Sequence, residues 1–311
     1  MSDRETEPQL SHPVYRGVRL TETDAHAGWL LSSGEQWAQT EDDWRFLLTR
    51  GIGFGFETSD GALAASAVLF PYEQRFAWIG MVLVAASARR QGLATSLLQH
   101  ALRLSQTQGL PLLLDATPAG RHVYAALGFH DLRRLTRWRS EAPDKTITTP
   151  QDLHQRGQKP DAGSQMTTVG PIETTYILDE WAEWDEPRFG ASRRAQLYFL
   201  WASRPELALH LADAKGERLG YCLGRAGRTA TQLGPLVAET ETDALALLRA
   251  SLNRTSGPVL IDLIDGRVSL ERELTERGFM PQRNFVRMGS NLAGEFGRPE
   301  CTFAIAGPEF G

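Results

Sequence analysis

One stretch of the sequence combines an apolar run, a basic turn with a glycine and a helical repeat of leucines. Residues 78–84 are nearly all apolar and have the length of a strand. Residues 93–104 place leucine and alanine at close to helical spacing. Between them, Gly92 lacks a Cβ, so the backbone can approach a bound group closely. The first N–H groups of a helix have no acceptor within it, and this stretch is therefore predicted to bind an anion such as phosphate or pyrophosphate.

The residues of the turn indicate which phosphate ligand to expect. The sequence lacks both the lysine-bearing phosphate loop and the dinucleotide-binding glycine fingerprint at this place. Residues 89–94 read Arg-Arg-Gln-Gly-Leu-Ala, a match to the pattern Arg/Gln-x-x-Gly-x-Gly/Ala. This segment resembles the one that binds the acyl-CoA pyrophosphate in the GNAT acetyltransferase superfamily. A basic turn before a helix can also be a plain solvated loop, so the interpretation depends on the surrounding sequence.

A second segment resembles the same superfamily. Residues 115–129 read Asp-Ala-Thr-Pro-Ala-Gly-Arg-His-Val-Tyr-Ala-Ala-Leu-Gly-Phe. In the superfamily a strand leads here into a short helix with a tyrosine four residues before Gly-Phe, and Tyr124 occupies that place. The sequence departs from the pattern at residues 118–120, where Pro-Ala-Gly stands at the position of a common asparagine.

The resemblance implies direct acyl transfer from acetyl-CoA to an amine. The pantetheine arm would lie between two splayed strands and pair with the backbone of one of them, as an added strand would. Tyr124 would protonate the leaving thiolate, although the usual tyrosine pKa of about 10 lies above the thiol value of about 8.5, so its position must assist. The implied cofactor-binding residues are Val82, Leu83, Val84, Arg89, Arg90, Gln91, Gly92, Leu93, Ala94 and Thr95.

No single residue can be named as the base that deprotonates the amine. Several carboxylates fall in segments expected on the acceptor side, but most also fit surface or capping positions, and a water relay would serve as well. Three tryptophans could line the acceptor pocket or pack as core and lid. The carboxylates are Glu22, Asp24, Asp42, Asp43 and Glu73, and the tryptophans are Trp29, Trp37 and Trp44.

Length and composition set the remaining bounds. A chain of 311 residues suits two domains of about 150 residues, and a net charge of −5 argues against a general nucleic-acid surface. Cys222 and Cys301 have no metal-type or redox spacing, and we expect no metal site. Residues 1–13 are polar, and no apolar run approaches the length of a membrane span. The expectation is a cytoplasmic protein without a membrane or nucleic-acid partner.

Matching residues recur 150 positions apart. Asp265 follows Asp115 at this distance, and Gly278-Phe279 follows Gly128-Phe129. The chain is therefore predicted to be a tandem duplication of one α/β (α+β) fold, each copy a mixed central sheet flanked by helices. We expect a catalytic domain over residues 1–143 and a degenerate GNAT-like domain over residues 144–311, with a mobile insert at about 155–168.

The second copy lacks the residues of the predicted chemistry. Residues 239–243 are acidic where the first copy has arginines and glycine, and Leu274 stands at the position of Tyr124. We expect this half to be free of CoA, like the accessory C-terminal domain of two-domain GNAT proteins that it resembles. Residues 302–311 are apolar and are expected to dock. One hypothesis places Glu309 or the carboxylate of Gly311 near the acceptor.

Three functions remain open on the sequence. The first is acetylation of a primary amine on a small molecule, and the second is acetylation of a protein or peptide. The third is an acyl-CoA-binding sensor without turnover, against which the retained Tyr124 argues. The sequence does not determine the acceptor, the acyl-chain preference or the oligomeric state.

Overall fold

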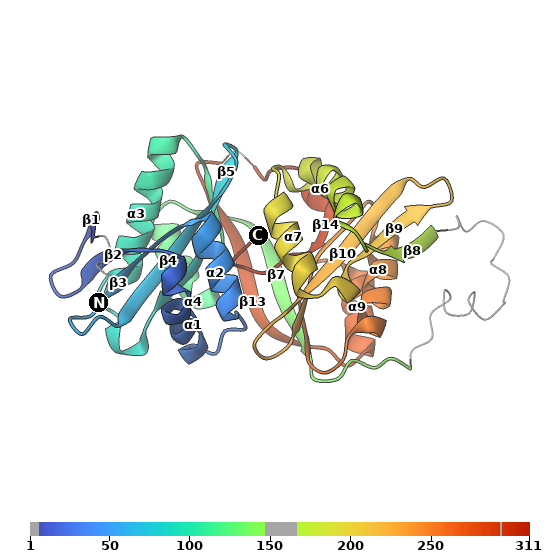
Figure 1. Cartoon of the computed structure of the whole chain (residues 1–311), viewed down its shortest axis with the longest axis horizontal. Helices are drawn as coiled ribbons and strands as arrows, with labels where there is room; N and C mark the ends of the chain where they lie inside the picture. Colours follow the sequence, from blue (N-terminus) through green and yellow to red (C-terminus); the bar gives the residue numbers. More distant parts are fainter. Residues whose placement is uncertain (1–5, 147–166, 293) are drawn as a thin grey trace.

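The computed structural model describes residues 6–146, 167–292 and 294–311, and within them the strands form one continuous sheet (Figure 1). Strands of the first half lie at one end and strands of the second half at the other. In spatial order they are β1 (Thr6–Ser11), β2 (Arg16–Leu20), β3 (Ile52–Glu57), β4 (Leu63–Tyr72), β5 (Phe76–Val84), β6 (Leu112–Ala116), β13 (Met280–Ser290), β7 (His130–Ser140), β12 (Val259–Ile264), β14 (Thr302–Ala304), β11 (Thr231–Ala238), β10 (Arg218–Ala226), β9 (Leu209–Asp213) and β8 (Thr167–Pro171).

Helices cover both faces of this sheet (Figure 1). Neighbouring residues of β4 and β5 point to opposite faces, so that Trp78 packs in one hydrophobic cluster and Ile79 in another. The first cluster includes residues of α2, α6 and α7, and the second includes the leucines of α3. The helices are α1 (Ala25–Gly34), α2 (Glu41–Arg50), α3 (Leu93–Gln108), α4 (Pro118–Ala126), α6 (Thr175–Phe189), α7 (Arg194–Ser203), α8 (Glu241–Arg254) and α9 (Val268–Glu276).

The predicted fold class is confirmed, and most predicted elements of the first half lie where the sequence placed them. The hairpin β3–β4 has its turn at Gly61, whose φ is +85°. Helix α2 begins at a capping box formed by Thr40 and Asp43. Strand β5 pairs in parallel with β6, as a strand–helix–strand crossover requires. Strand β1, which pairs with β2, lies within the polar N-terminal segment and has no strand pattern in the sequence.

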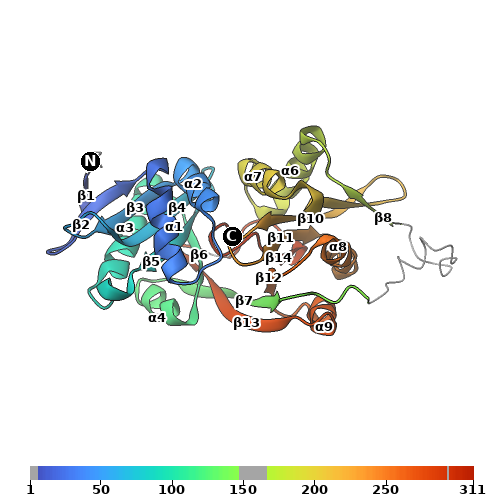
Figure 2. The same ribbon diagram turned by 60° about the horizontal axis from the view of Figure 1, so that its bottom comes forward.

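The two halves exchange their last strands (Figure 2). Strand β13 of the second half pairs with β6 of the first, and β7 of the first half pairs with β12 of the second. The exchanged strands also pair with each other, with Leu135 opposite Phe285. These two residues stand 150 positions apart, so equivalent positions of the duplication face each other at the centre of the sheet. The boundary expected after residue 143 therefore divides the sequence but not the sheet.

The duplication is visible in the element bounds. Helix α9 and strand β13 begin and end 150 residues after α4 and β7. The expected insert at 155–168 lies outside the described residues except for Thr167 and Thr168, which begin β8. No helix in the described ranges is both long and apolar enough to span a membrane.

The gap between two strands of the second half is filled by the chain itself. Strands β11 and β12 pair in parallel from Thr231 to Leu233 and then separate. Strand β14 enters between them and pairs antiparallel with both, opposite Leu236 of β11 and Leu263 of β12. The backbone groups exposed by the separation are thereby satisfied within the chain.

A buried ion pair holds the exchanged strand β7 against β12. Arg137 donates two hydrogen bonds of 2.7 Å to the carboxylate of Asp262, which has no exposed surface. Replacing Asp262 with alanine leaves a buried guanidinium without its partner. We expect the free energy of unfolding in urea to fall by about 3–5 kcal/mol.

The control is Glu141→Ala, which removes the carboxylate of a solvent-exposed ion pair with Arg139, on the same strand. This variant should unfold at the same urea concentration as the unmodified protein. Equal unfolding midpoints for Asp262→Ala and the unmodified protein would show that the exchanged strand does not depend on this pair.

Candidate active site

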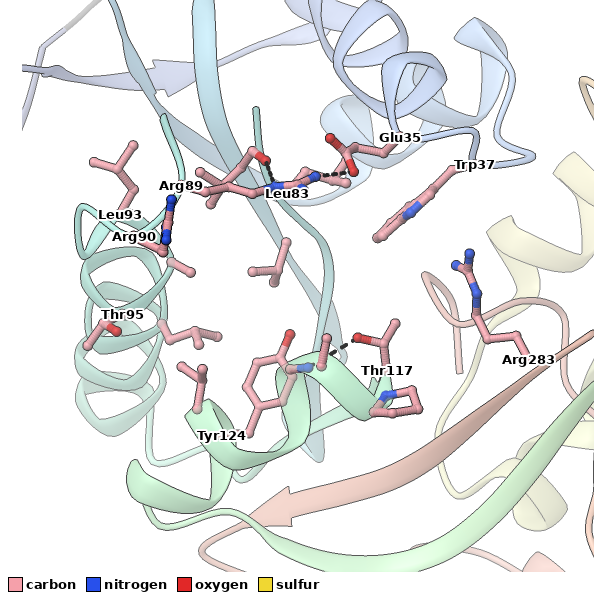
Figure 3. Close-up of a pocket in the computed structure, with 18 of the residues that line it drawn as sticks. Glu35, Trp37, Leu83, Arg89, Arg90, Leu93, Thr95, Thr117, Tyr124 and Arg283 are labelled. Atoms are coloured by element: carbon pink, nitrogen blue, oxygen red, sulfur yellow. Dashed lines mark hydrogen bonds and ion pairs between the residues drawn. The ribbon is translucent and has the colours of Figure 1, made fainter. Parts of the chain in front are cut away.

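A large cleft opens where β5 ends, with a volume of about 1210 Å³ (Figure 3). One wall is formed by the end of β5, the basic turn and the start of α3, and another by α4. Trp37, from the segment between α1 and α2, and residues 281–284 at the start of β13 complete it. The cleft therefore combines the two sequence motifs of the first half with a strand of the second.

The cleft exists because β5 and β6 separate. Their parallel pairing covers only Ala77 with Leu112 and Trp78 with Leu113. Beyond these pairs, Met81 has a φ of +54° and β5 shifts its register against β4. A bulge of this kind bends a strand away from its neighbour. The side of β5 facing β6 is thus open at residues 82–84, which line the cleft.

The basic turn forms an anion-binding end of the cleft. Gly92 has a φ of +81°, in the left-handed region that favours glycine, and it precedes the first residue of α3. As N-cap residue it has no side chain to accept hydrogen bonds from the first turn. Those N–H groups and the positive end of the helix dipole therefore remain available to an anion beside Leu93, Ala94 and Thr95.

The three side chains before Gly92 point in different directions. Arg89 forms an ion pair with Glu35 and donates a hydrogen bond of 3.3 Å to the carbonyl of Val84 (Figure 3). Arg90 lines the cleft with a φ of +61°. Gln91 is the one predicted cofactor residue that does not line the cleft, because its side chain donates to the hydroxyl of Tyr15.

Tyr124 lies on α4 with its hydroxyl directed into the cleft (Figure 3). The ring packs edge-on against Phe129, with 6.1 Å between the ring centroids. Burial raises the pKa of Tyr124 to about 12, because the phenolate would lose hydration there. The hydroxyl therefore stays protonated at neutral pH and can act as a hydrogen-bond or proton donor.

A smaller cavity of about 80 Å³ continues from Tyr124 into the gap between β5 and β6. Residues Ile79 to Val82 lie on one side and Leu114 and Asp115 on the other. Asp115 is neutralised by Arg287 of β13 through two hydrogen bonds of 3.0 Å. The cavity is narrower than the cleft and shares Val82, Thr117 and Tyr124 with it.

The C-terminal tail forms part of this smaller cavity. The indole of Trp78 donates a 2.9 Å hydrogen bond to the carbonyl of Pro308, and Tyr72 donates to the carbonyl of Phe310. Glu309 lines the cavity and accepts a hydrogen bond of 2.9 Å from Gln39. The tail thus docks, as its apolar sequence predicted, and the surface it docks on includes residues of the first half.

Glu309 is buried in a charged network that ties the halves together. It pairs with Arg225 of β10, and Arg225 also pairs with Asp43 of α2. Burial raises the pKa of Glu309, and the positive charge of Arg225 opposes that shift. With its carboxylate engaged by Arg225 and Gln39, Glu309 anchors the tail rather than standing free as a base.

The acceptor-side carboxylates expected from the sequence do not line the cleft. Glu22 and Asp42 lie near Arg45, Asp24 caps the turn at Thr21, and Asp43 is held by Arg225. Among the tryptophans, Trp37 lines the cleft, whereas Trp44 is fully buried in the core. Glu73 lies in the turn before β5 and Trp29 packs beside the core of α1 and α2, both away from the cleft.

In the second half the gap between the separating strands is closed, and a pocket of about 500 Å³ lies beside the end of β12, lined by residues 132–134 and 264–267. Strand β14 occupies the gap that corresponds to the one between β5 and β6. Residues 239–243, which follow β11 and begin α8, carry three acidic side chains, and Leu274 lies buried at the position equivalent to Tyr124. The residues that the sequence could not place in the site are 281–284, because their position depends on the strand exchange.

Comparison with known proteins agrees with this duplicated arrangement. Residues 20–129 match the acetyltransferase (GNAT) family, and residues 182–295 match an acetyltransferase (GNAT) domain. An uncharacterised N-acetyltransferase of Bacillus subtilis, YitH, is 22% identical over 239 residues, which are 77% of this chain and 78% of that protein.

Two solved structures share the fold over nearly the whole chain. A putative acetyltransferase from Pyrococcus horikoshii superposes with a TM-score of 0.72 at 17% identity, covering 97% of this chain and 98% of that one. A tandem GNAT protein from the clavulanic acid biosynthesis pathway reaches a TM-score of 0.56 at 15% identity, covering 89% and 98%. Together with the two family matches, these likenesses identify the chain as a tandem protein of the GNAT N-acetyltransferase superfamily.

Proposed function

We propose that the protein transfers an acetyl group from acetyl-CoA to a primary amine of a small molecule. The observation that carries the proposal is the open edge of β5, which leads to the uncapped start of α3 on one side and to Tyr124 on the other. The small cavity of about 80 Å³ beyond Tyr124 favours a small acceptor over a protein chain. A protein that only senses CoA would not need a proton donor beside the thioester, so the position of Tyr124 favours catalysis over sensing.

The donor would bind along β5 from the turn inward. The pyrophosphate would accept hydrogen bonds from the backbone N–H groups that follow Gly92, with Arg90 adding positive charge. The pantetheine arm would pair with the backbone of residues 82–84, which the separation of β5 from β6 leaves open. Val82, Leu83, Val84 and Ala94 would supply the apolar contacts of the arm, and Arg89 would shape the turn through Glu35.

Acyl transfer would take place between β5 and Tyr124. The unprotonated amine attacks the thioester carbonyl, and a backbone N–H of β5 can stabilise the negative charge that develops on the carbonyl oxygen. The attacking nitrogen becomes positively charged and releases its extra proton to water, and the carbon–sulfur bond breaks. Tyr124 then gives its proton to the departing thiolate. Because the pKa of Tyr124 is about 12, the proton transfer to the thiolate is uphill. The hydroxyl must therefore lie close to the sulfur and donate its proton while the carbon–sulfur bond is breaking.

Replacing Gly92 with valine tests the donor site. A β-branched residue is strained at a φ of +81° and would displace the N–H groups that follow. We expect the affinity for CoA, measured by calorimetry, to fall at least about tenfold.

The matched control is Gly61→Val, in the β3–β4 turn, where the φ is +85° and no atom stands near the added side chain. It imposes the same backbone strain away from the cleft and should leave CoA binding unchanged. If Gly92→Val leaves the affinity for CoA unchanged, the proposal that CoA binds at this turn is contradicted.

Replacing Tyr124 with phenylalanine removes the proton donor and keeps the ring against Phe129. We expect kcat to fall about 100-fold or more, with CoA affinity unchanged, because a positioned acid contributes to the rate and not to donor binding. The measurement is the rate of thiol release from acetyl-CoA in the presence of an amine that the unmodified enzyme acetylates. A kcat within a factor of about two of the unmodified enzyme would exclude Tyr124 as the acid.

A further inference from the structure

One arginine faces the cleft without a counter-ion. Arg283 of β13 lines both the large cleft and the smaller cavity, and its side chain is exposed. Its guanidinium forms no hydrogen bond or ion pair with any residue of the described ranges, although its backbone pairs with β7. In Figure 3 it lies on the opposite side of Tyr124 from Arg90, away from the turn proposed for the pyrophosphate. It therefore stands at the acceptor end of the cleft.

The position of Arg283 follows from a bulge in the exchanged strand. Pro281 lies opposite Trp138 and Arg283 lies opposite Arg137, so Gln282 is an extra residue in the pairing. A regular strand directs alternate residues to opposite faces, yet residues 281–284 all line the cleft. In a regular strand, neighbouring residues would point to opposite faces. The bulge thus allows Arg283 to line the cleft together with its neighbours.

The other arginines around the cleft are already neutralised or assigned. Arg89 pairs with Glu35, Arg137 with Asp262, and Arg287 with Asp115. Although Arg283 is solvent-accessible, the surrounding walls of the cleft displace part of its hydration, and this desolvation together with the nearby charge of Arg137 lowers its pKa. Asp262 acts in the opposite sense but is paired with Arg137. Within the described residues, Arg283 is therefore the arginine at this end of the cleft that no carboxylate engages directly, and Glu309, which shares Arg225 with Asp43, lines the same smaller cavity.

The duplication offers an internal comparison. Arg133 of β7 stands 150 residues before Arg283, at the equivalent position of the other exchanged strand. Its guanidinium pairs with Glu295 and donates a 2.8 Å hydrogen bond to the carbonyl of Pro299. In the half whose strand gap is closed by β14, the chain thus supplies a carboxylate to the equivalent arginine, whereas no carboxylate of the described residues forms an ion pair with Arg283.

We propose that the acceptor is an amine that also carries an anionic group, a carboxylate or a phosphate, and that Arg283 binds this group. The inference rests on the proposed amine acetylation. A guanidinium matches the paired oxygens of either anion and holds them with a fixed orientation. With its anion held at Arg283 and its amine directed toward Tyr124, the acceptor would span the smaller cavity. The specificity of the N-terminal half is then supplied by a strand of the C-terminal half.

Matched acetylated products test the anion site without depending on turnover. N-acetylphenylalanine is compared with N-acetylphenethylamine, and the phosphate ester of N-acetylethanolamine with N-acetylethanolamine, by calorimetry on the CoA-saturated protein. We expect the anionic member of at least one pair to bind about tenfold or more tightly than its neutral partner. The pair that shows the preference identifies carboxylate or phosphate as the anion.

The preference should disappear in Arg283→Gln and persist in Arg272→Gln. Arg272 is an exposed arginine on α9 that does not line the cleft. Unchanged heats with CoA show that both variants are folded. Equal binding of both members of each pair to the unmodified protein overturns the proposal, and so does a preference that survives Arg283→Gln.

Thiol release from acetyl-CoA with phenylalanine, phenethylamine, O-phosphoethanolamine and ethanolamine separates this inference from the proposed function. If neutral and anionic amines are acetylated at equal rates and their products bind equally, the proposed acetyltransferase reaction stands and the proposed anion site is contradicted. An Arg283-dependent preference among the products, with no thiol release from any amine, would leave the anion site and contradict the acetyltransferase reaction.

Discussion

The structure depends on how the backbone groups of separating parallel strands are satisfied. Parallel pairing breaks off in both halves after a few residues, between β5 and β6 and between β11 and β12. Unpaired N–H and C=O groups are costly when they are buried without a partner. In the second half β14 enters the gap and supplies that partner. In the first half the gap stays open to a cleft, and we propose that the pantetheine arm completes it as β14 does in the other half.

The strand exchange makes the site a product of both halves. Strand β13 brings Arg287 to neutralise Asp115 beneath the smaller cavity and places Arg283 at its mouth. The tail contributes Glu309, which Arg225 and Gln39 hold in place. A half that has lost its own cleft therefore still determines the shape and charge of the other one.

The sequence predicted those features of the structure that depend on residues close together in the chain. The apolar runs and the turn at Gly61 indicated β3 and β4, and the motif around Gly92 indicated the uncapped helix start that the structure has there. The separation of 150 residues, shared by Asp115 and Asp265 and by the two Gly-Phe pairs, indicated the duplication. The docking of the tail followed from its apolar character.

The parts that escaped prediction depend on partners far apart in the chain. Nothing local in residues 280–290 indicates that this strand pairs with β6 of the other half. The cleft residues 281–284 could therefore not be identified, and Gln91 was placed in the site although it contacts Tyr15 instead. Four of the five carboxylates chosen as candidate bases, all except Glu73, have other partners, in caps and ion pairs, that a one-dimensional pattern does not reveal.

The central claim is that one gap of the duplicated sheet accepts a CoA thioester and the other is closed by the chain. The stoichiometry of CoA binding in solution tests it most directly. Calorimetric titration of the full chain should give one CoA per chain. A chain that binds no CoA, or one that binds two, would contradict the account.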